Sequence, residues 1–190
     1  MPPFILASNS PRRLTLLRQM GVVPDQVAPA NLTEHALPHE LPVQIAARLA
    51  RAKATYIADK YPGAVILGAD TIVACGRRSL PKAETMEEAK FCLELLSGRR
   101  HRVHTGLCVI DTDGKAHVRL VTTQVKFKRL DVTEMDSYLS SMEWQGKAGG
   151  YAIQGRAEAM ISWMSGSYSN VVGLPLYETT MLLRACGLPV

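Results

Sequence analysis

Three groups of polar side chains in this chain have types and spacings that packing alone does not explain. The first is the segment Ser8–Arg13, which carries two serines and two arginines where a short apolar stretch gives way to a predicted helix. A helix N-terminus is the positive end of the helix dipole, so Arg12 and Arg13 are unfavourable there unless an anion binds beside them. Backbone N–H groups and guanidinium groups both donate to phosphate oxygens. The segment predicts a phosphate site, although an ordinary helix start with exposed arginines is the alternative, and the GxxxxGK[ST] pattern of a P-loop is absent.

The second and third groups are a lone acid and a lone base in apolar surroundings. Asp70 is the only carboxylate in the run 64–75, which has the Val- and Ile-rich pattern of a strand covered on both faces. A carboxylate buried without a partner is costly, so we expect a cation, a metal ion or a cleft beside it, unless backbone groups at a strand end satisfy it. Lys53 falls on the inward stripe of a predicted helix over 42–60. Its ammonium is expected at the edge of a polar site, unless its stem simply reaches out to solvent.

The spacing of apolar residues, together with capping and turn residues, places these side chains on a mixture of helices and strands. Ser10 and Thr133 are the expected N-caps of two helices, Gly21 closes the first of them, and Asp113-Gly114 predicts a hairpin. The hairpin interrupts the βαβ alternation, so we expect an α/β fold with a mixed, twisted sheet, flanking helices and two lobes around a deep cleft. Helices are expected over about 11–20, 42–60, 84–96, 133–142 and 175–186, and strands over about 4–7, 64–75, 101–111 and 115–128.

Composition narrows the class of protein. The chain has 190 residues, of which 47% are hydrophobic and 21% charged, so it predicts a single globular domain over 1–190 rather than disorder or a coiled coil. No apolar run approaches the roughly 20 residues that span a bilayer, and the N-terminus lacks the features of a signal peptide. The sequence therefore predicts a cytoplasmic protein with no membrane partner.

Charge, aromatic and cysteine patterns limit the partners. The net charge of +5 suggests an anionic ligand. However, the few aromatic residues do not alternate with basic ones, and no predicted helix carries the basic side chains that contact DNA bases. No stable nucleic-acid partner is therefore expected. His101 and His104 are expected on opposite faces of a strand and not as a metal pair. The cysteines form no CxxC pair and are expected to be free thiols in a reducing compartment: Cys75, Cys92, Cys108 and Cys186.

Four segments together resemble the Maf family of nucleoside triphosphate pyrophosphatases: 5–13 (ILASNSPRR), 67–71 (LGADT), 147–155 (KAGGYAIQG) and 172–176 (VGLPL). They occur in the family's order along nearly the whole chain. The resemblance implies an α/β fold with a deep cleft, a homodimer, and hydrolysis of a nucleoside triphosphate between its α and β phosphorus atoms.

The resemblance also assigns roles within the site. It implies that Asp70 is the general base, or acts through a bound divalent ion, and that Glu34 and Asp70 hold the metal, with Mg²⁺ expected and Mn²⁺ as the alternative. Asn31 and Thr33 stand where family members often have acids, which leaves Glu34 as the carboxylate of that loop. The residues implied to bind the substrate are Ser8, Arg12, Arg13, Lys53, Thr71, Lys82 and Gln154.

The positions associated with base choice favour the branch of the family that acts on dTTP and UTP. Arg12, Thr71 and Gln154 match that branch. The branch that acts on 7-methyl-GTP typically has tryptophan in place of Arg12, glutamine in place of Thr71 and glutamate in place of Gln154. The amide of Gln154 can donate to O4 and accept from N3–H of uracil or thymine, whereas a cationic 7-methylguanine favours a carboxylate. Hydrolysis of 7-methyl-GTP and a non-catalytic role in cell division or septum formation are the two alternatives.

Overall fold

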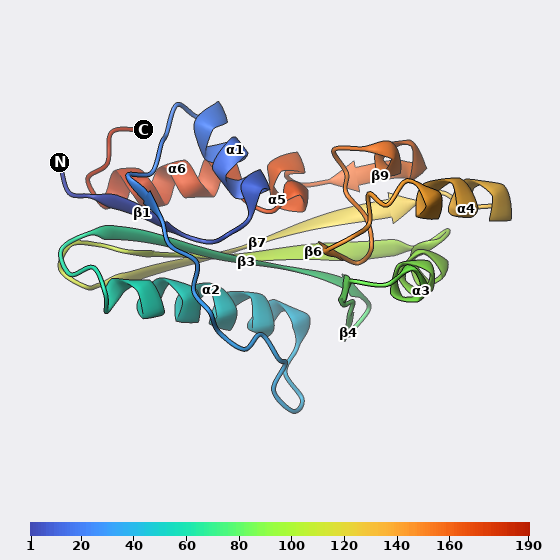
Figure 1. Ribbon diagram of the computed structural model, residues 1–190, viewed down its shortest axis with the longest axis horizontal. Coiled ribbons are helices and arrows are strands. Elements are labelled where there is room, and N and C mark those ends of the chain that lie inside the picture. Colours follow the sequence, from blue (N-terminus) through green and yellow to red (C-terminus); the bar gives the residue numbers. More distant parts are fainter.

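The computed structural model describes residues 1–190 and is built on one mixed sheet (Figure 1). The strands of this sheet are β1 (Phe4–Ala7), β2 (Gln26–Val27), β3 (Val65–Cys75), β4 (Arg78–Ser79), β6 (Arg100–Ile110), β7 (Ala116–Phe127) and β9 (Ile161–Ser165). They run in the order β2-β1-β3-β6-β7-β9, and β4 pairs with one end of β3. β1 is parallel to β2 and β3, whereas the β3–β6, β6–β7 and β7–β9 pairs are antiparallel. The mixed sheet predicted from the sequence is confirmed.

One face of the sheet is covered by a single long helix, α2 (Pro42–Ala58). Two glycines let it approach closely: a Cβ at Gly68 would lie 2.5 Å from the carbonyl oxygen of Ala50, and one at Gly106 would lie 2.2 Å from that of Ala46. No side chain fits at either position without moving backbone. The helix is therefore held near enough for an inward lysine to reach the side chain of a strand.

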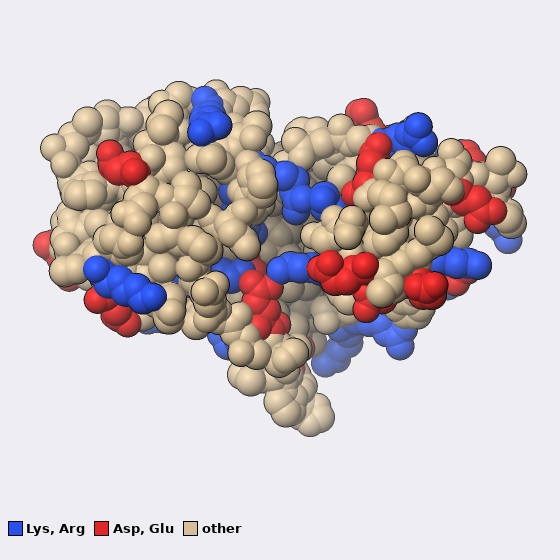
Figure 2. Space-filling model, viewed as in Figure 1, with Lys and Arg blue, Asp and Glu red and all other residues tan.

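The opposite face carries the other elements and divides into two lobes. The lobe near both chain ends has α1 (Pro11–Gln19), α5 (Tyr168–Val172) and α6 (Leu176–Ala185). The other lobe, formed by the middle of the chain, has α3 (Met86–Leu96), α4 (Val132–Ser140), the 3₁₀ helix η1 (Arg156–Met160) and a small sheet of β5 (Lys82–Ala83) and β8 (Lys147–Ala148). One cluster of 32 buried residues continues beneath both lobes. The surface is hollowed between them, and basic side chains gather in the hollow (Figure 2).

The long predicted elements are present with shifted ends. The N-cap of helix α4 lies two residues earlier than predicted, at Asp131 and not at Thr133: the Asp131 carboxylate accepts from the backbone N–H of Glu134, 2.8 Å away. Ser10 occupies the N-cap position of α1, but its side chain makes no capping bond. The hairpin is confirmed, since Gly114 adopts the positive φ of 80° that its turn requires. The sequence did not predict α5, η1 or the short strands β2, β4, β5, β8 and β9.

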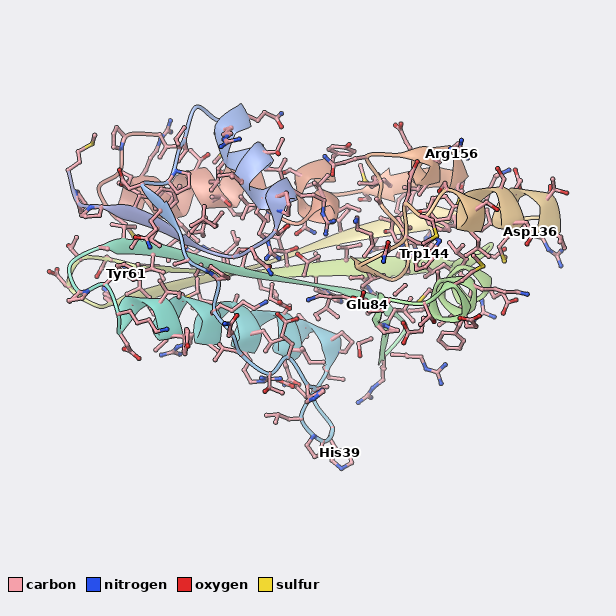
Figure 3. The ribbon with its side chains drawn as sticks, in the orientation of Figure 1. His39, Tyr61, Glu84, Asp136, Trp144 and Arg156 are labelled. Atoms are coloured by element: carbon pink, nitrogen blue, oxygen red, sulfur yellow. The ribbon has the colours of Figure 1, made fainter.

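The connection from β2 to α2, residues 28–41, contains no helix or strand and projects past α2, with His39 at its tip (Figure 3). This loop carries Glu34. Elsewhere, His101 and His104 lie on opposite faces of β6 as predicted, because His101 bonds to Tyr151 while His104 bonds to Thr122.

Two further expectations can be compared with the structure. All four cysteines are free. None of the helices is long and apolar enough to cross a membrane. The cytoplasmic location and the homodimer stay predictions.

Candidate active site

A deep cleft lies at the edge of β3, where β1 leaves the sheet. β1 pairs with β3 only as far as Ala7, opposite Gly68, and the chain then turns into α1. Between this point and Ala74, where β4 begins to pair with β3, this edge has no strand partner, and Asp70 and Thr71 lie there on opposite faces of the strand. The cavity has a volume of about 800 Å³ and is lined by both lobes, which is large enough for a small-molecule ligand. In α/β sheets, ligands commonly bind beyond the carboxyl end of a strand in this way.

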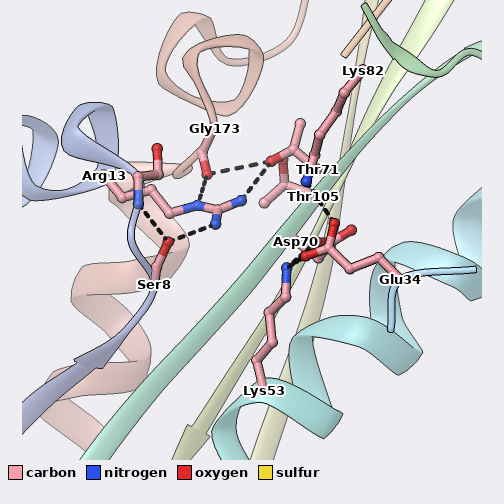
Figure 4. Close-up of polar contacts among 10 residues, drawn as sticks. Ser8, Arg13, Glu34, Lys53, Asp70, Thr71, Lys82, Thr105 and Gly173 are labelled. Carbon is pink, nitrogen blue, oxygen red and sulfur yellow. Dashed lines mark hydrogen bonds and ion pairs between the residues drawn. The ribbon is translucent and has the colours of Figure 1, made fainter. Parts of the chain in front are cut away.

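On the α2 face of β3, two acids and two lysines form a chain of ion pairs across the cleft, which we call the acid–lysine cluster (Figure 4). The ammonium of Lys53 lies 2.6 Å from Oδ1 of Asp70 and 2.5 Å from Oε1 of Glu34. Lys82, on β5 of the other lobe, lies 2.5 Å from Oε2 of Glu34. Asp70 and Lys53 are 3% and 7% exposed, so the cation expected beside the buried acid is present and comes from α2.

Glu34 holds this cluster together. Burial alone would raise the pKa of its carboxyl, but hydrogen bonds from Lys53 and Lys82 outweigh that effect and lower the pKa to about 2. Glu34 is therefore ionised at neutral pH. Because Lys53 lies on α2 and Lys82 lies on β5, the carboxylate of Glu34 links these two elements across the cleft.

On the other face of β3, Arg13 is almost fully buried without a carboxylate partner. Its Nε donates to the carbonyl oxygen of Gly173 at 2.9 Å, Nη1 donates to the Ser8 hydroxyl at 2.9 Å and Nη2 donates to Thr71 Oγ1 at 3.2 Å. All three acceptors are neutral, and desolvation lowers the pKa of Arg13. A guanidinium has five N–H donors, so one remains on each of Nη1 and Nη2. A buried cation with two unused N–H donors is suited to a phosphate.

The start of α1 adds further donors on the same side. Nε of Arg12 donates to the carbonyl oxygen of Val172 at 3.3 Å, and desolvation lowers the pKa of Arg12. The Ser8 hydroxyl accepts from the backbone N–H of Ser10 at 3.2 Å. Since the helix has no side-chain cap, its N-terminal end is open to an anion in the cleft.

Every residue that the sequence suggested for the site lines this one cleft, although their individual roles stay predictions. Thr71 differs from the expectation in one respect: its hydroxyl contacts Arg13 and the Thr105 hydroxyl, so within the chain it supports the arginine. Gln154 is exposed in the cleft on the segment after β8. The suggested residues are Ser8, Arg12, Arg13, Glu34, Lys53, Asp70, Thr71, Lys82 and Gln154.

The cleft also contains groups that sequence reasoning did not single out. Lys147 begins one of the four matched segments and lines the cleft, half-buried, where desolvation and then the charge of Arg12 lower the pKa of its ammonium. The backbone carbonyl groups of Val172 and Gly173 accept hydrogen bonds from Arg12 and Arg13. Such acceptors cannot be recognised from the sequence, because every residue has a backbone carbonyl. Thr105 could not be recognised as part of the site from the sequence, because its hydrogen-bond partner Thr71 lies 34 residues away along the chain.

The family follows from a comparison with known protein families. A model described as Maf-like protein matches residues 3–186. This chain belongs to the Maf family. Among curated Maf relatives, proteins named dTTP/UTP pyrophosphatase are similar over almost the full length. The one from Paramagnetospirillum magneticum is 57% identical, covering 98% of each chain. The one from Rhodospirillum rubrum is 55% identical, covering 97% of this chain and 88% of that protein. The one from Caulobacter vibrioides is 54% identical, covering 98% and 96%.

The Maf chain also resembles a solved structure of a more distant protein. A HAM1 protein from Coxiella burnetii superposes with a TM-score of 0.56 over 97% of this chain and 100% of that one, at 18% identity. At this identity the likeness concerns the fold alone, and it agrees with the mixed sheet flanked by helices.

Proposed function

We propose that this Maf protein is a nucleoside triphosphate pyrophosphatase that hydrolyses dTTP and UTP to the nucleoside monophosphate and pyrophosphate. The observation that carries the proposal is that one cleft holds both the buried guanidinium of Arg13, which has no carboxylate partner, and the carboxyl groups of the acid–lysine cluster. The guanidinium is suited to bind a polyphosphate, and a carboxylate is suited to accept a proton from the attacking water. Three relatives at 54–57% identity carry the name dTTP/UTP pyrophosphatase.

The triphosphate binds where positive charge is not already matched. Arg12 and Arg13 supply guanidinium donors beside the open end of α1, whereas Lys53 and Lys82 contact carboxylates in the free protein. A phosphate oxygen that approaches Lys82 competes with Glu34, which is one-third exposed on its side chain. Substrate binding therefore exchanges the Glu34–Lys82 contact for a contact to phosphate.

Asp70 is the base in this proposal. Lys53 contacts Oδ1 of Asp70, which leaves Oδ2 as the oxygen that can accept a proton from water in the cleft. The water oxygen bonds to the α phosphorus, its proton passes to Asp70, and the bond from the α phosphorus to the oxygen that bridges it to the β phosphorus breaks. Pyrophosphate leaves with the electron pair of that bond. Lys53 fixes the orientation of the carboxylate, and general-base assistance of this kind contributes about 10²- to 10⁴-fold in rate.

The carboxylates of the cleft fit a divalent ion that takes part of its ligands from the substrate. No group of three or more His, Cys, Asp or Glu side chains is arranged to hold a metal. Mg²⁺ commonly binds one or two carboxylates and completes its shell with phosphate oxygens and water. Glu34 and Asp70 would hold Mg²⁺, or Mn²⁺, and the bound ion would neutralise phosphate charge.

Selection of the nucleobase is assigned to side chains that line the cleft. Gln154 is exposed there, and its amide can both donate to O4 and accept from N3–H of thymine or uracil. Arg12 lies on the other lobe, at the start of α1, and Thr71 contributes through its contact with Arg13. We assign selection of the pyrimidine to Gln154 and Arg12 together.

A substrate panel tests the proposal. Purified protein with Mg²⁺ is given dTTP, UTP, CTP, ATP, GTP and 7-methyl-GTP, and the products are separated by ion-exchange chromatography. We expect pyrophosphate and monophosphate from dTTP and UTP in preference to the purine nucleotides. Release of orthophosphate would refute the bond assignment, and preference for 7-methyl-GTP would refute the base assignment. Binding of a partner that survives Asp70→Asn, with no turnover of any nucleotide by the unmodified protein, would favour the non-catalytic alternative.

A further inference from the structure

Both arginines of the phosphate site are held by the end of one short element. The carbonyl oxygen of Val172 accepts from Arg12, and that of Gly173 accepts from Arg13. Gly173 has a φ of 130°, a conformation that L side chains rarely adopt, and this turn directs its carbonyl toward the guanidinium. We call residues 167–173, which include α5, the α5 bracket. The position of the bracket therefore determines where both guanidinium groups point.

A buried amide fixes the bracket to the sheet. Asn170 is completely buried, and its Nδ2 donates to the carbonyl oxygen of Val103 on β6 at 3.1 Å and to Thr123 Oγ1 on β7 at 2.9 Å. One side chain thus spans two neighbouring strands. Its Oδ1 is buried with no hydrogen-bond partner. An apolar residue would avoid this unpaired oxygen but would also take the donor away from Val103 and Thr123, so the amide is best explained by what its two N–H donors hold in place.

The hydroxyl of Thr123 is the second anchor. It accepts from the backbone N–H of Ser167 at 3.0 Å and from Asn170, and it donates to the carbonyl oxygen of Ser167 at 3.1 Å. Thr123 is itself completely buried and lies on β7, two strands away from β3 and Asp70. It lines no part of the cleft, so it has no direct access to a bound nucleotide.

A third contact joins the bracket to the open edge of β3. The Thr105 hydroxyl on β6 bonds to the backbone carbonyl of Asn170 at 3.3 Å and to the hydroxyl of Thr71 at 2.9 Å. Thr71 in turn contacts Arg13. The guanidinium of Arg13 is therefore connected to the buried amide by two routes, one through Gly173 and one through Thr71.

We propose that Asn170 and Thr123 are positioning residues for substrate binding, which act by setting the α5 bracket and, through it, the guanidinium groups of Arg12 and Arg13. The inference rests on the proposed function, in which these guanidinium groups bind the triphosphate. A buried polar network that spans three strands and ends on two cations specifies one arrangement more strictly than apolar packing does. Small displacements of a binding group are costly, because a misplacement of about 1 Å can lower a rate about a hundredfold.

The test uses a matched pair of substitutions remote from the cleft. Thr123→Val keeps the shape of the side chain and removes the hydroxyl, whereas Thr123→Ser keeps the hydroxyl and removes a methyl group. Binding of inorganic tripolyphosphate is measured by calorimetry, and KM and kcat are measured with dTTP. We expect Thr123→Val to weaken tripolyphosphate binding about tenfold and to raise KM more than it lowers kcat. Thr123→Ser is expected to retain nearly normal binding.

Two controls separate positioning from a loss of stability. Leu139→Ala opens a cavity in the buried part of α4 in the other lobe, and it is expected to lower the melting temperature without changing tripolyphosphate affinity. In a double-mutant cycle, Thr123→Val should have a smaller effect once Arg13→Lys has removed one of the two guanidinium groups that it positions. Asn170→Ala serves as the second variant if Thr123→Val does not fold.

The outcomes are distinct from those that test the proposed function. If Thr123→Val and Thr123→Ser bind tripolyphosphate equally well, or if the effects of Thr123→Val and Arg13→Lys simply add, the positioning role is wrong. If the unmodified protein binds tripolyphosphate but does not hydrolyse dTTP, the proposed function fails, and the comparison of affinities still decides the role of the bracket.

Discussion

Replacing Arg13 by lysine keeps the positive charge of the phosphate site and removes its planar geometry. In the native protein Arg13 donates to Ser8, Thr71 and the carbonyl group of Gly173, and an ammonium in the same place holds about one of these contacts. The two lost hydrogen bonds from a charged donor contribute about 1.5–3 kcal/mol each. Arg13→Lys should therefore destabilise the fold by at least about 3 kcal/mol, a loss visible as a lower melting temperature.

The effect of Arg13→Lys on catalysis can be worked out from the donors left over. One N–H remains on each terminal nitrogen of Arg13 for the phosphate, and lysine offers one donor in that direction. Losing one charged hydrogen bond of about 1.5–3 kcal/mol lowers kcat/KM for dTTP about 10- to 150-fold. The matched control is Arg18→Lys, an exposed arginine on the same helix, which should leave both quantities unchanged. Steady-state kinetics within twofold of the native protein for Arg13→Lys would refute the reasoning.

Three other predictions concern different parts of the site and the core. Asp70→Asn should lower kcat at least about a hundredfold at saturating dTTP, because an amide cannot accept the proton of the attacking water; near-normal turnover would remove that role. Gln154→Glu should shift the substrate preference in the panel away from dTTP and UTP, and an unchanged ranking would show that Gln154 does not read the base. Burial lowers the pKa of His101 to about 4. As the pH falls below about 6.5, His101 therefore becomes protonated in the unfolded chain but stays neutral in the native protein. This contribution to stability is complete above about pH 6.5 and is lost, up to about 3 kcal/mol, as the pH falls to 4; His101→Phe should flatten urea-unfolding stability over that interval.

The elements that carry the site could be predicted from the sequence because they are long or sharply punctuated. The apolar run of β3 made Asp70 conspicuous, and the inward position of Lys53 on α2 marked it as a residue of a polar site, but the direct pairing of the two was not predicted. Their contact at 2.6 Å joins two elements that are adjacent along the chain. Periodicity was enough to single out these two residues, but not to place them in contact.

The remaining parts depended on the family resemblance or were not found. Glu34 lies on a loop without periodicity and Lys82 on a two-residue strand, so no local pattern marks either as part of the acid–lysine cluster. The α5 bracket is five residues of helix flanked by glycine and serine, too short for a helical period. Its anchor Asn170 is 47 residues from Thr123, and a single sequence contains no sign of such a pair.

The most direct test of the account is to follow dTTP with the unmodified protein and Mg²⁺ by ³¹P NMR and to identify the first products. If the cations of α1 and the base on β3 act on one triphosphate as proposed, dTMP and pyrophosphate appear together in equal amounts from the first turnover. The appearance of dTDP and orthophosphate, or unchanged dTTP, would contradict the account.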